Sequence, residues 1–301
     1  FTSSRGVQTT VKDYINRSIS DILNAEINWP FTRAEGSVDA IAGKQLYSFA
    51  SIASTLKYID YDNVFLMPKD YITNGDFEIS GSASITNWAT ISGSPAASSK
   101  FGNTLLLTSA KSSQEVEDLI VGKSYVILIQ TSGATLTLDV GTSSGGTQTK
   151  TTTLTIASGN EVLLSEVTFT ATATTHYVTF TESAGATAYV KLVQLAENIT
   201  PIGLKYISYE EYSERYRERD SRPDTDKFSD PEFIYTTYND EIGLSPIPDT
   251  SNRTIKFDYY TSNVDLSAHG DTSIIPTRFE SVINARAKYY TYMFRSDVQT
   301  A

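Results

Sequence analysis

Apolar and polar residues alternate at period two between residues 73 and 198, in short stretches separated by Gly, Ser and Asn. This alternation is typical of β-strands with one buried face. The stretches are Leu105–Thr108, Tyr125–Ile129, Thr135–Val140, Thr153–Ile156, Val167–Thr170, Tyr177–Phe180 and Tyr189–Val193. About seven or eight such strands with turns between them predict an antiparallel β-sandwich or jelly roll.

Three segments outside this region space their apolar residues three and four apart, which predicts amphipathic helices. The first runs from Thr10, as N-cap, to about Glu26, and the aromatic residues of Trp29-Pro30-Phe31 cover its end. The second runs from Tyr209 to Arg219 behind the capping box Ser208–Glu211. The third follows Thr277 as cap. Its apolar stripe comprises Phe279, Val282, Ile283, Ala287, Tyr290, Met293 and Phe294.

Short β-patterns lie between these helices. They are a hairpin over 36–49 with its turn at Ala42–Lys44, a strand Leu56–Leu66 bent near 60–62, a short strand Leu204–Ile207, strands over 232–238 and 241–244, and a strand Thr254–Tyr260. We therefore expect an α+β fold outside 73–198. The three helices pack together, with a small antiparallel sheet beside them.

Composition changes sharply at the edges of the alternating region. No arginine lies between Arg33 and Arg215, and Ser, Thr, Gly and Ala dominate that region, whereas the flanks are rich in Tyr, Arg and acidic residues. Such a shift marks a domain boundary. We expect a host domain formed by 1–72 and 199–301, interrupted by an inserted β-sandwich domain at 73–198.

Charge and cysteine content exclude several function classes. The net charge of −11 disfavours a protein that grips nucleic acid or an anionic membrane surface. The absence of cysteine excludes disulfides and thiolate sites. The chain has neither a run of about 18 apolar residues nor the apolar core of a signal peptide, so we expect no membrane partner.

The alternating region opens with Asn74-Gly-Asp-Phe-Glu78, followed by Trp88. This opening resembles that of carbohydrate-binding modules of the jelly-roll, galactose-binding-like type. The resemblance implies a structural calcium, held in part by a carboxylate near the last strand, and sugar binding on exposed aromatic rings. The last strand, 188–193, carries no Asp or Glu. Candidate rings are Trp88, Phe101, Tyr125, Tyr177 and Tyr189, and a core position is the favoured interpretation of each.

A co-linear series of host residues resembles the head-to-tail adaptor proteins of tailed, short-tailed above all, double-stranded DNA bacteriophages. The series comprises Trp29-Pro-Phe31, Ala42-Gly43, Tyr47, Leu204–Tyr212, Leu244–Asp249, Phe257–Tyr260 and Ile275-Pro276. The resemblance covers nearly all of the host and none of the insert. It implies a virion protein of the neck that forms a ring, usually of twelve copies. That ring joins the portal protein to the tail tube or nozzle and lets DNA pass during ejection.

No catalytic, cofactor or metal site is indicated. His176 and His269 lack spacing partners, and Ser54-Thr-Leu-Lys57 matches S-x-x-K without the other motifs of that class. Acidic pairs such as Glu115/Glu117 and Asp60/Asp62 are better interpreted as solvated charges, although paired carboxylates of a glycosidase depend on the fold. The arginines of 215–222 alternate with Glu and Asp, which favours local ion pairs over a DNA contact.

The sequence therefore predicts a structural connector that is not an enzyme and needs no cofactor. In this hypothesis the sandwich is a peripheral interaction or decoration domain, with tail fibres among its possible partners, and DNA passes without specific binding. The alternative hypothesis is a carbohydrate-binding protein or an accessory module of a glycosidase. A third is an enzyme whose site the pattern does not reveal.

Overall fold

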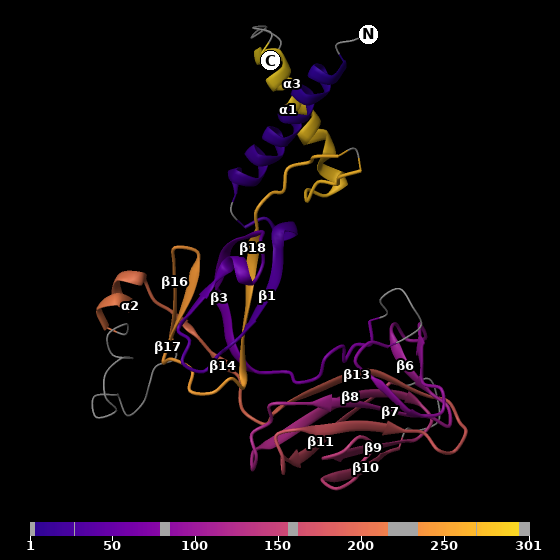
Figure 1. Cartoon of the computed structure of the whole chain (residues 1–301). Coiled ribbons are helices and arrows are strands. Elements are labelled where there is room, and N and C mark those ends of the chain that lie inside the picture. Colours follow the sequence, from indigo (N-terminus) through magenta and orange to yellow (C-terminus); the bar gives the residue numbers. More distant parts are fainter. Residues whose placement is uncertain are drawn as a thin grey trace. The chain divides into compact units, whose positions relative to one another are not determined.

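The structure is a computed structural model that describes residues 4–26, 28–78, 85–155, 162–215, 234–268 and 270–294. Its contacts divide the chain into two compact units. Unit 1 comprises Phe1–Met67, Ile202–Ser251 and Ile255–Ala301, and unit 2 comprises Pro68–Pro201 with Asn252–Thr254. Figure 1 labels many of the elements of both units.

Unit 2 contains two five-stranded sheets (Figure 1). One has the order β10-β9-β12-β7-β4 and the other β11-β8-β13-β6-β5, and their pairings are antiparallel. The strands are β4 (Ala89–Ser92), β5 (Ala96–Ser98), β6 (Thr104–Leu107), β7 (Lys111–Val116), β8 (Ser124–Gly133), β9 (Leu136–Gly141), β10 (Lys150–Leu154), β11 (Leu163–Thr170), β12 (His176–Thr181) and β13 (Ala188–Glu197). Each of the seven predicted stretches overlaps a strand; Thr153–Ile156 does so at Thr153 and Leu154, and Ile156 lies outside the described residues.

The core of unit 2 comes from alternate residues of both sheets. Ile127 and Ile129 of β8 are fully buried, as are Leu138 of β9 and Phe180 of β12, and all belong to one apolar cluster. Alternation places successive side chains on opposite faces of a strand, so each sheet contributes one face to this shared core. The result is a β-sandwich.

The opening motif Asn74–Glu78 closes one part of this core. Phe77 is fully buried, and its ring centroid lies 5.3 Å from that of Trp88. Gly75 accepts a hydrogen bond from the Val193 amide at 2.8 Å. A Cβ at Gly75 would lie 2.0 Å from the Val193 carbonyl oxygen, so only glycine fits against β13 there.

Unit 1 contains two four-stranded sheets, with the orders β1-β18-β3-β14 and β15-β16-β17-β2. Their strands are β1 (Arg33–Asp39), β2 (Leu46–Ser48), β3 (Leu56–Pro68), β14 (Ile202–Gly203), β15 (Lys205–Tyr206), β16 (Ile234–Tyr238), β17 (Glu241–Ser245) and β18 (Arg253–Thr261), the last of which begins in unit 2. A shared core includes Tyr47, Ile59, Tyr235 and Ile255.

The helices of unit 1 are α1 (Ser4–Ala25), α2 (Tyr209–Arg215) and α3 (Glu280–Phe294), with short 3₁₀ turns at Pro30–Thr32, Phe49–Ser51 and Thr277–Phe279. Figure 1 shows α1 beside α3, and α2 beside β16. Tyr212 of α2 is buried in a small cluster with Ile207 and Ile234. The Ser208 hydroxyl accepts from the Glu211 amide at 3.3 Å, which confirms Ser208 as the N-cap of α2.

The predicted α+β fold class is wrong. Most regular structure in the described residues is strand, and unit 1 is built on two sheets instead of a packed set of three helices. Within the residues that the structure describes, α1 and α3 pack on one another, whereas α2 packs on β16. The reason is that the buried Tyr212 of α2 donates a hydrogen bond to the Leu244 carbonyl of β17, which ties this helix to a sheet.

The predicted hairpin over 36–49 is also wrong. β1 lies next to β18, and β2 pairs with β17, so these two successive strands belong to different sheets. The predicted N-caps of the first and third helices are also wrong. Helix α1 begins before Thr10, and Pro276 precedes the 3₁₀ turn that leads into α3, which places Thr277 inside that turn.

Candidate interaction surface on the helix pair

Helices α1 and α3 pack through an apolar seam. Ile19 and Leu23 of α1 are buried against Ile283 of α3 and Ile275 of the preceding loop. Trp29 packs on this cluster and donates its indole N–H to the Ile22 carbonyl at 3.1 Å. This bond satisfies a carbonyl in the last turn of α1, which has no partner within the helix. The prediction that Trp29 and Phe31 cover the end of the helix is confirmed.

A polar cluster at the edge of this seam links the same two helices. The Asp21 carboxylate accepts from Arg286 Nε at 3.0 Å and from Arg286 Nη2 at 2.9 Å, and it also accepts from the Tyr290 hydroxyl. Arg17 lies 4.4 Å from the centroid of the Tyr290 ring. The Tyr290 hydrogen bond, with smaller contributions from Arg286, holds the pKa of Asp21 below its usual range, against the opposing effect of burial.

Replacing Asp21 by asparagine is expected to destabilise the helix pair. We expect a loss of about 0.5–1 kcal/mol, because the carboxylate is partly exposed and solvent screens the pair. Since the folded pKa is lowered, the contribution is present above the unfolded pKa of about 3.9 and is lost as pH falls through the folded value. Urea unfolding followed by far-ultraviolet circular dichroism measures the loss. Asp13→Asn, an exposed change on α1, is the matched control, and equal losses in the two variants would contradict this role.

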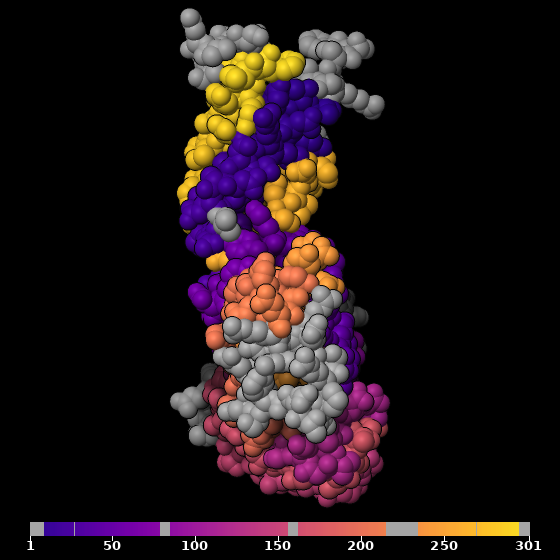
Figure 2. Space-filling model, turned by 90° about the vertical axis from the view of Figure 1, so that its left-hand side faces the viewer, coloured from indigo at the N-terminus to yellow at the C-terminus, as the bar shows by residue number. Residues whose placement is uncertain are grey.

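Exposed apolar side chains flank Arg286 on the face of α3 beside this seam, and Phe279 of the preceding 3₁₀ turn continues the row. Phe279, Val282, Tyr289 and Met293 follow one another at intervals of three, seven and four residues. We call this set the α3 stripe. Phe279 is 37%, Val282 49% and Met293 45% exposed, and Tyr289 is half-buried. With Arg286 between them, these positions have the a/d spacing of a helix seam that packs on another helix. Figure 2 shows the surface of α3 in yellow beside that of α1 in indigo.

The sequence alone did not separate the two faces of α3. The predicted stripe combined Ile283 and Tyr290, which face α1, with Phe279, Val282 and Met293, which do not. An exposed apolar seam of this kind can bind another protein surface. No group of three or more His, Asp or Glu side chains in the described part of the chain is placed to hold a metal ion.

Two of the five aromatic candidates for a sugar platform lie in the core, and the other three are half-buried. Trp88 and Tyr125 are buried in the core of unit 2, which confirms the favoured interpretation for both. Phe101 and Tyr189 are half-buried and pack edge to face, with Lys100 within 5.1 Å of each ring centroid. The half-buried Tyr177 donates its hydroxyl to Glu115 at 2.8 Å.

Of the two histidines, His176 lies within the described residues. His176 is fully buried in unit 2, and burial lowers the pKa of its imidazole. His269 lies outside the described residues, as does most of the arginine-rich segment 215–222. Lys57 of the S-x-x-K match donates to the Asn24 side-chain oxygen at 3.3 Å.

Asp70, which precedes the opening motif, and Glu197 of the last strand have protein partners. β13 extends beyond the predicted Val193 to Glu197, so the last strand does carry an acidic residue. The buried Glu197 carboxylate accepts from the Asn252 side chain and lies 3.8 Å from the Lys123 ammonium. Asp70 accepts from the amides of Ile72 and Leu195, both at 3.0 Å. Amide donors and a cation therefore contact these two carboxylates.

Comparison with known families bears on the second half of the chain. Residues 149–301 match the family model described as "SU10 adaptor protein". The chain belongs to the SU10 adaptor protein family. Membership confirms, at the family level, the expectation of a structural phage adaptor and virion component. No curated protein matched the chain. Within the described residues of this adaptor, no helix has the length and hydropathy to cross a membrane.

Several solved structures are distantly similar to the adaptor. The enzymatically active domain of tailspike protein 4 from bacteriophage CBA120 is 14% identical, with a TM-score of 0.34, over 42% of this chain and 21% of that one. The module TmCBM61, solved with β-1,4-galactotriose, is 16% identical, with a TM-score of 0.33, over 43% of this chain and 99% of that one. A family 16 carbohydrate-binding module is 14% identical, with a TM-score of 0.33, over 42% and 99%. These likenesses are too remote to transfer a ligand or an activity.

Proposed function

We propose that this adaptor forms a ring that joins the portal protein of a tailed, short-tailed phage to its tail tube and lets DNA pass. The observation that carries the proposal is the α3 stripe, an apolar helical seam left exposed on a member of an adaptor family. In the ring, the α3 stripe of each copy packs on a different surface of the next copy. A head-to-tail contact of this kind closes into a ring when the rotation between copies permits.

Native mass spectrometry of the purified chain, with and without the portal protein, tests ring formation. We expect a cyclic oligomer, twelve copies in the simplest case, in the presence of the portal, which acts as a template for assembly. A chain that stays monomeric with the portal, or that forms a two-fold dimer as its main species, would contradict the proposal.

The negative net charge of the chain suits a channel through which DNA slides. The chain carries −11, and each phosphate contact by Lys or Arg would add salt-dependent affinity that holds the genome in place. We expect no binding of duplex DNA by the purified adaptor in a gel-shift assay at physiological salt. The matched control is a variant in which several acidic side chains are replaced by lysine. Tight binding by the unmodified chain would contradict DNA transit without specific contacts.

We also propose that 73–198 is an inserted, separable domain at the periphery of the ring, available to tail fibres or other partners. Deleting 73–198 and bridging the ends with a short Gly/Ser linker is expected to leave a folded remainder, because insertions are tolerated where the host ends are close. Circular dichroism and assembly with the portal measure this. The control is a deletion of equal length shifted to begin inside β7, which should not fold. An unfolded remainder from the first deletion would contradict the insertion.

A further inference from the structure

The sheet β1-β18-β3-β14 of unit 1 has one face in the apolar core and an opposite, outward face. Ile255 and Phe257 of β18 belong to the core, so the alternate residues Lys256 and Asp258 point outward. Phe65 of β3, the strand on one side of β18, is 42% exposed. Figure 1 shows β1 and β3 on either side of β18.

A depression of about 390 Å³ lies on this outward face. Its outward-pointing lining comes from β1, β3 and β18, and we call this set the sheet recess: Glu35, Ser37, Asn63, Phe65, Lys256 and Asp258. Phe65 places a large, partly exposed apolar ring beside the depression. Covering this ring with another apolar element is favourable, and a helix packed on a sheet face is a common layer arrangement.

The outward face is acidic. Four carboxylates and two cations lie on it: Glu35, Asp39, Asp60, Asp258, Arg33 and Lys256. Arg33 pairs with Asp258 and lies 3.5 Å from Asp60, so one guanidinium serves both carboxylates. Glu35 is exposed and makes no hydrogen bond or ion pair within the part of the chain that the structure describes. It is therefore a carboxylate of the recess that can pair with a cation from outside.

The α3 stripe carries the opposite charge. Arg278 is exposed, and its guanidinium lies 5.0 Å from the centroid of the Phe279 ring at the start of the stripe. Helical geometry places Glu280 on the far side of α3 from the stripe. Arg286 already pairs with Asp21 at 2.9 Å, whereas no carboxylate of the described residues contacts Arg278. Arg278 is thus the cation that the stripe can offer to a second copy.

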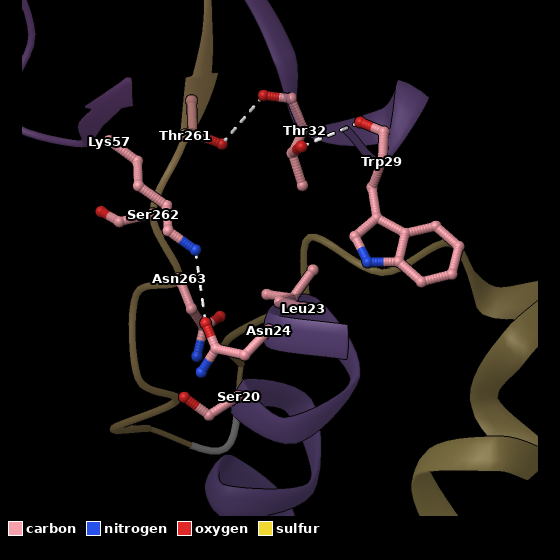
Figure 3. Close-up of a pocket in the computed structure, with 9 residues that line it drawn as sticks. All are labelled: Ser20, Leu23, Asn24, Trp29, Thr32, Lys57, Thr261, Ser262 and Asn263. Carbon is pink, nitrogen blue, oxygen red and sulfur yellow. Dashed lines mark hydrogen bonds between the residues drawn. The ribbon is translucent and has the colours of Figure 1, made fainter. Parts of the chain in front are cut away.

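A second pocket of unit 1 does not complement the stripe in this way. It has a volume of about 240 Å³ and lies between α1, β3 and the segment after β18. Figure 3 shows its lining, in which Lys57 is present and no Asp or Glu occurs. Lys57 would repel Arg278. The charges therefore favour the sheet recess.

We propose that the sheet recess is the surface on which the α3 stripe of the next copy packs. This inference rests on the proposed ring and names its second surface. Val282 of the next copy packs on Phe65, and Arg278 of the next copy pairs with Glu35. Glu35 and Phe65 lie two strands apart, about 10 Å. Arg278 and Val282 are one helical turn apart, about 6 Å along the axis, and the long arginine side chain spans the difference.

The absence of cysteine from the chain allows a direct test, because each introduced thiol is unique. Phe65→Cys and Val282→Cys are combined in one full-length chain. This chain is assembled with a portal protein whose own thiols are blocked, and a short bismaleimide is added. We expect a ladder of covalent oligomers on a denaturing gel, because each copy joins one thiol to each neighbour. Each single variant should give no ladder.

The matched control combines Phe65→Cys with Asn284→Cys. Asn284 is exposed on the opposite side of α3 from the stripe, so its thiol should not reach the recess. This chain should assemble and give no ladder. Native mass spectrometry of each variant with the portal reads ring formation separately from cross-linking.

Reversing the charges tests the ion pair. Glu35→Arg and Arg278→Glu should each raise the concentration needed for assembly at least about tenfold, as expected for a close interfacial charge pair. The chain with both changes should recover, because opposite charges face one another again. Lys288→Glu, on the exposed surface of α3 away from the stripe, should not rescue Glu35→Arg.

Rings without a ladder from the Phe65→Cys, Val282→Cys chain would overturn this surface and leave the proposed ring intact. Equal ladders from the Asn284→Cys control would overturn it as well. The same holds if Glu35→Arg and Arg278→Glu together assemble no better than either change alone. An unmodified chain that forms no ring with the portal would overturn the proposed function and this surface together.

Discussion

Replacing Val282 by glutamate is expected to abolish assembly of the adaptor while leaving each copy folded. Val282 is 49% exposed in the single chain, so the change costs little in the isolated fold. In the proposed ring the same position is buried against the next copy. A charge buried there without a partner costs about 3–5 kcal/mol at each interface, and this cost is repeated around the ring. Native mass spectrometry with the portal protein measures the loss, and Met293→Glu should behave alike.

Asn284→Glu is the matched control. It lies on the same helix, is exposed, and adds the same single negative charge, but it points away from the α3 stripe by helical geometry. Assembly of this variant should equal that of the unmodified chain. Circular dichroism should show that all three variants fold. Full assembly of Val282→Glu would show that the α3 stripe is not the contact between copies, whereas loss in Asn284→Glu would show that net charge alone controls assembly.

Replacing Gly75 by alanine is expected to destabilise unit 2 by about 3 kcal/mol or more. The added methyl carbon would lie 2.0 Å from the Val193 carbonyl oxygen, which belongs to the backbone of β13 and cannot rotate away. The hydrogen bond from the Val193 amide to the Gly75 carbonyl would be disrupted as well. Urea unfolding followed by Trp88 fluorescence, in a Trp29→Phe background, measures the change. Trp88 reports on this site because its ring packs on Phe77.

Gly102→Ala separates this steric effect from the general cost of removing a glycine. Gly102 has φ +93°, but its added methyl group would meet no atom within 4 Å. We expect a loss of about 1 kcal/mol there, which is the cost of a positive φ for alanine. Equal losses at Gly75 and Gly102 would contradict the close approach of the opening motif to β13.

Local alternation in the sequence predicted most of the sandwich strands but missed β4, β5 and β7. β7 reads Lys111-Ser-Ser-Gln-Glu-Val116, which has no apolar alternation. Its Gln114 is nevertheless buried, because the side-chain amide donates to the Thr73 and Asn87 carbonyls and its oxygen accepts from the Thr73 amide. A buried polar residue that is satisfied by distant backbone groups leaves no signal in a hydrophobic pattern.

The errors in unit 1 come from pairing between residues far apart in sequence. The segment after β1 has the composition of a hairpin turn, but Gly43 donates to the Pro248 carbonyl at 2.8 Å, and the Ala42 amide to the Ser251 hydroxyl at 3.0 Å. These contacts direct the chain from the sheet that contains β1 to the sheet that contains β2. The spacing of apolar residues at three and four positions likewise predicted α3. This spacing could not show that one apolar face packs on α1 while the other stays exposed. The exposed face is the part of the candidate surface that required the structure.

Symmetry-free electron microscopy of the intact virion tests the central claim most directly. The account predicts a ring at the neck between the portal and the tail tube. Unit 1 should fit this ring once per copy, with the α3 stripe at each contact between neighbours. A virion in which the adaptor density lies away from the neck, or in which neighbouring copies are related by two-fold axes, would contradict the account.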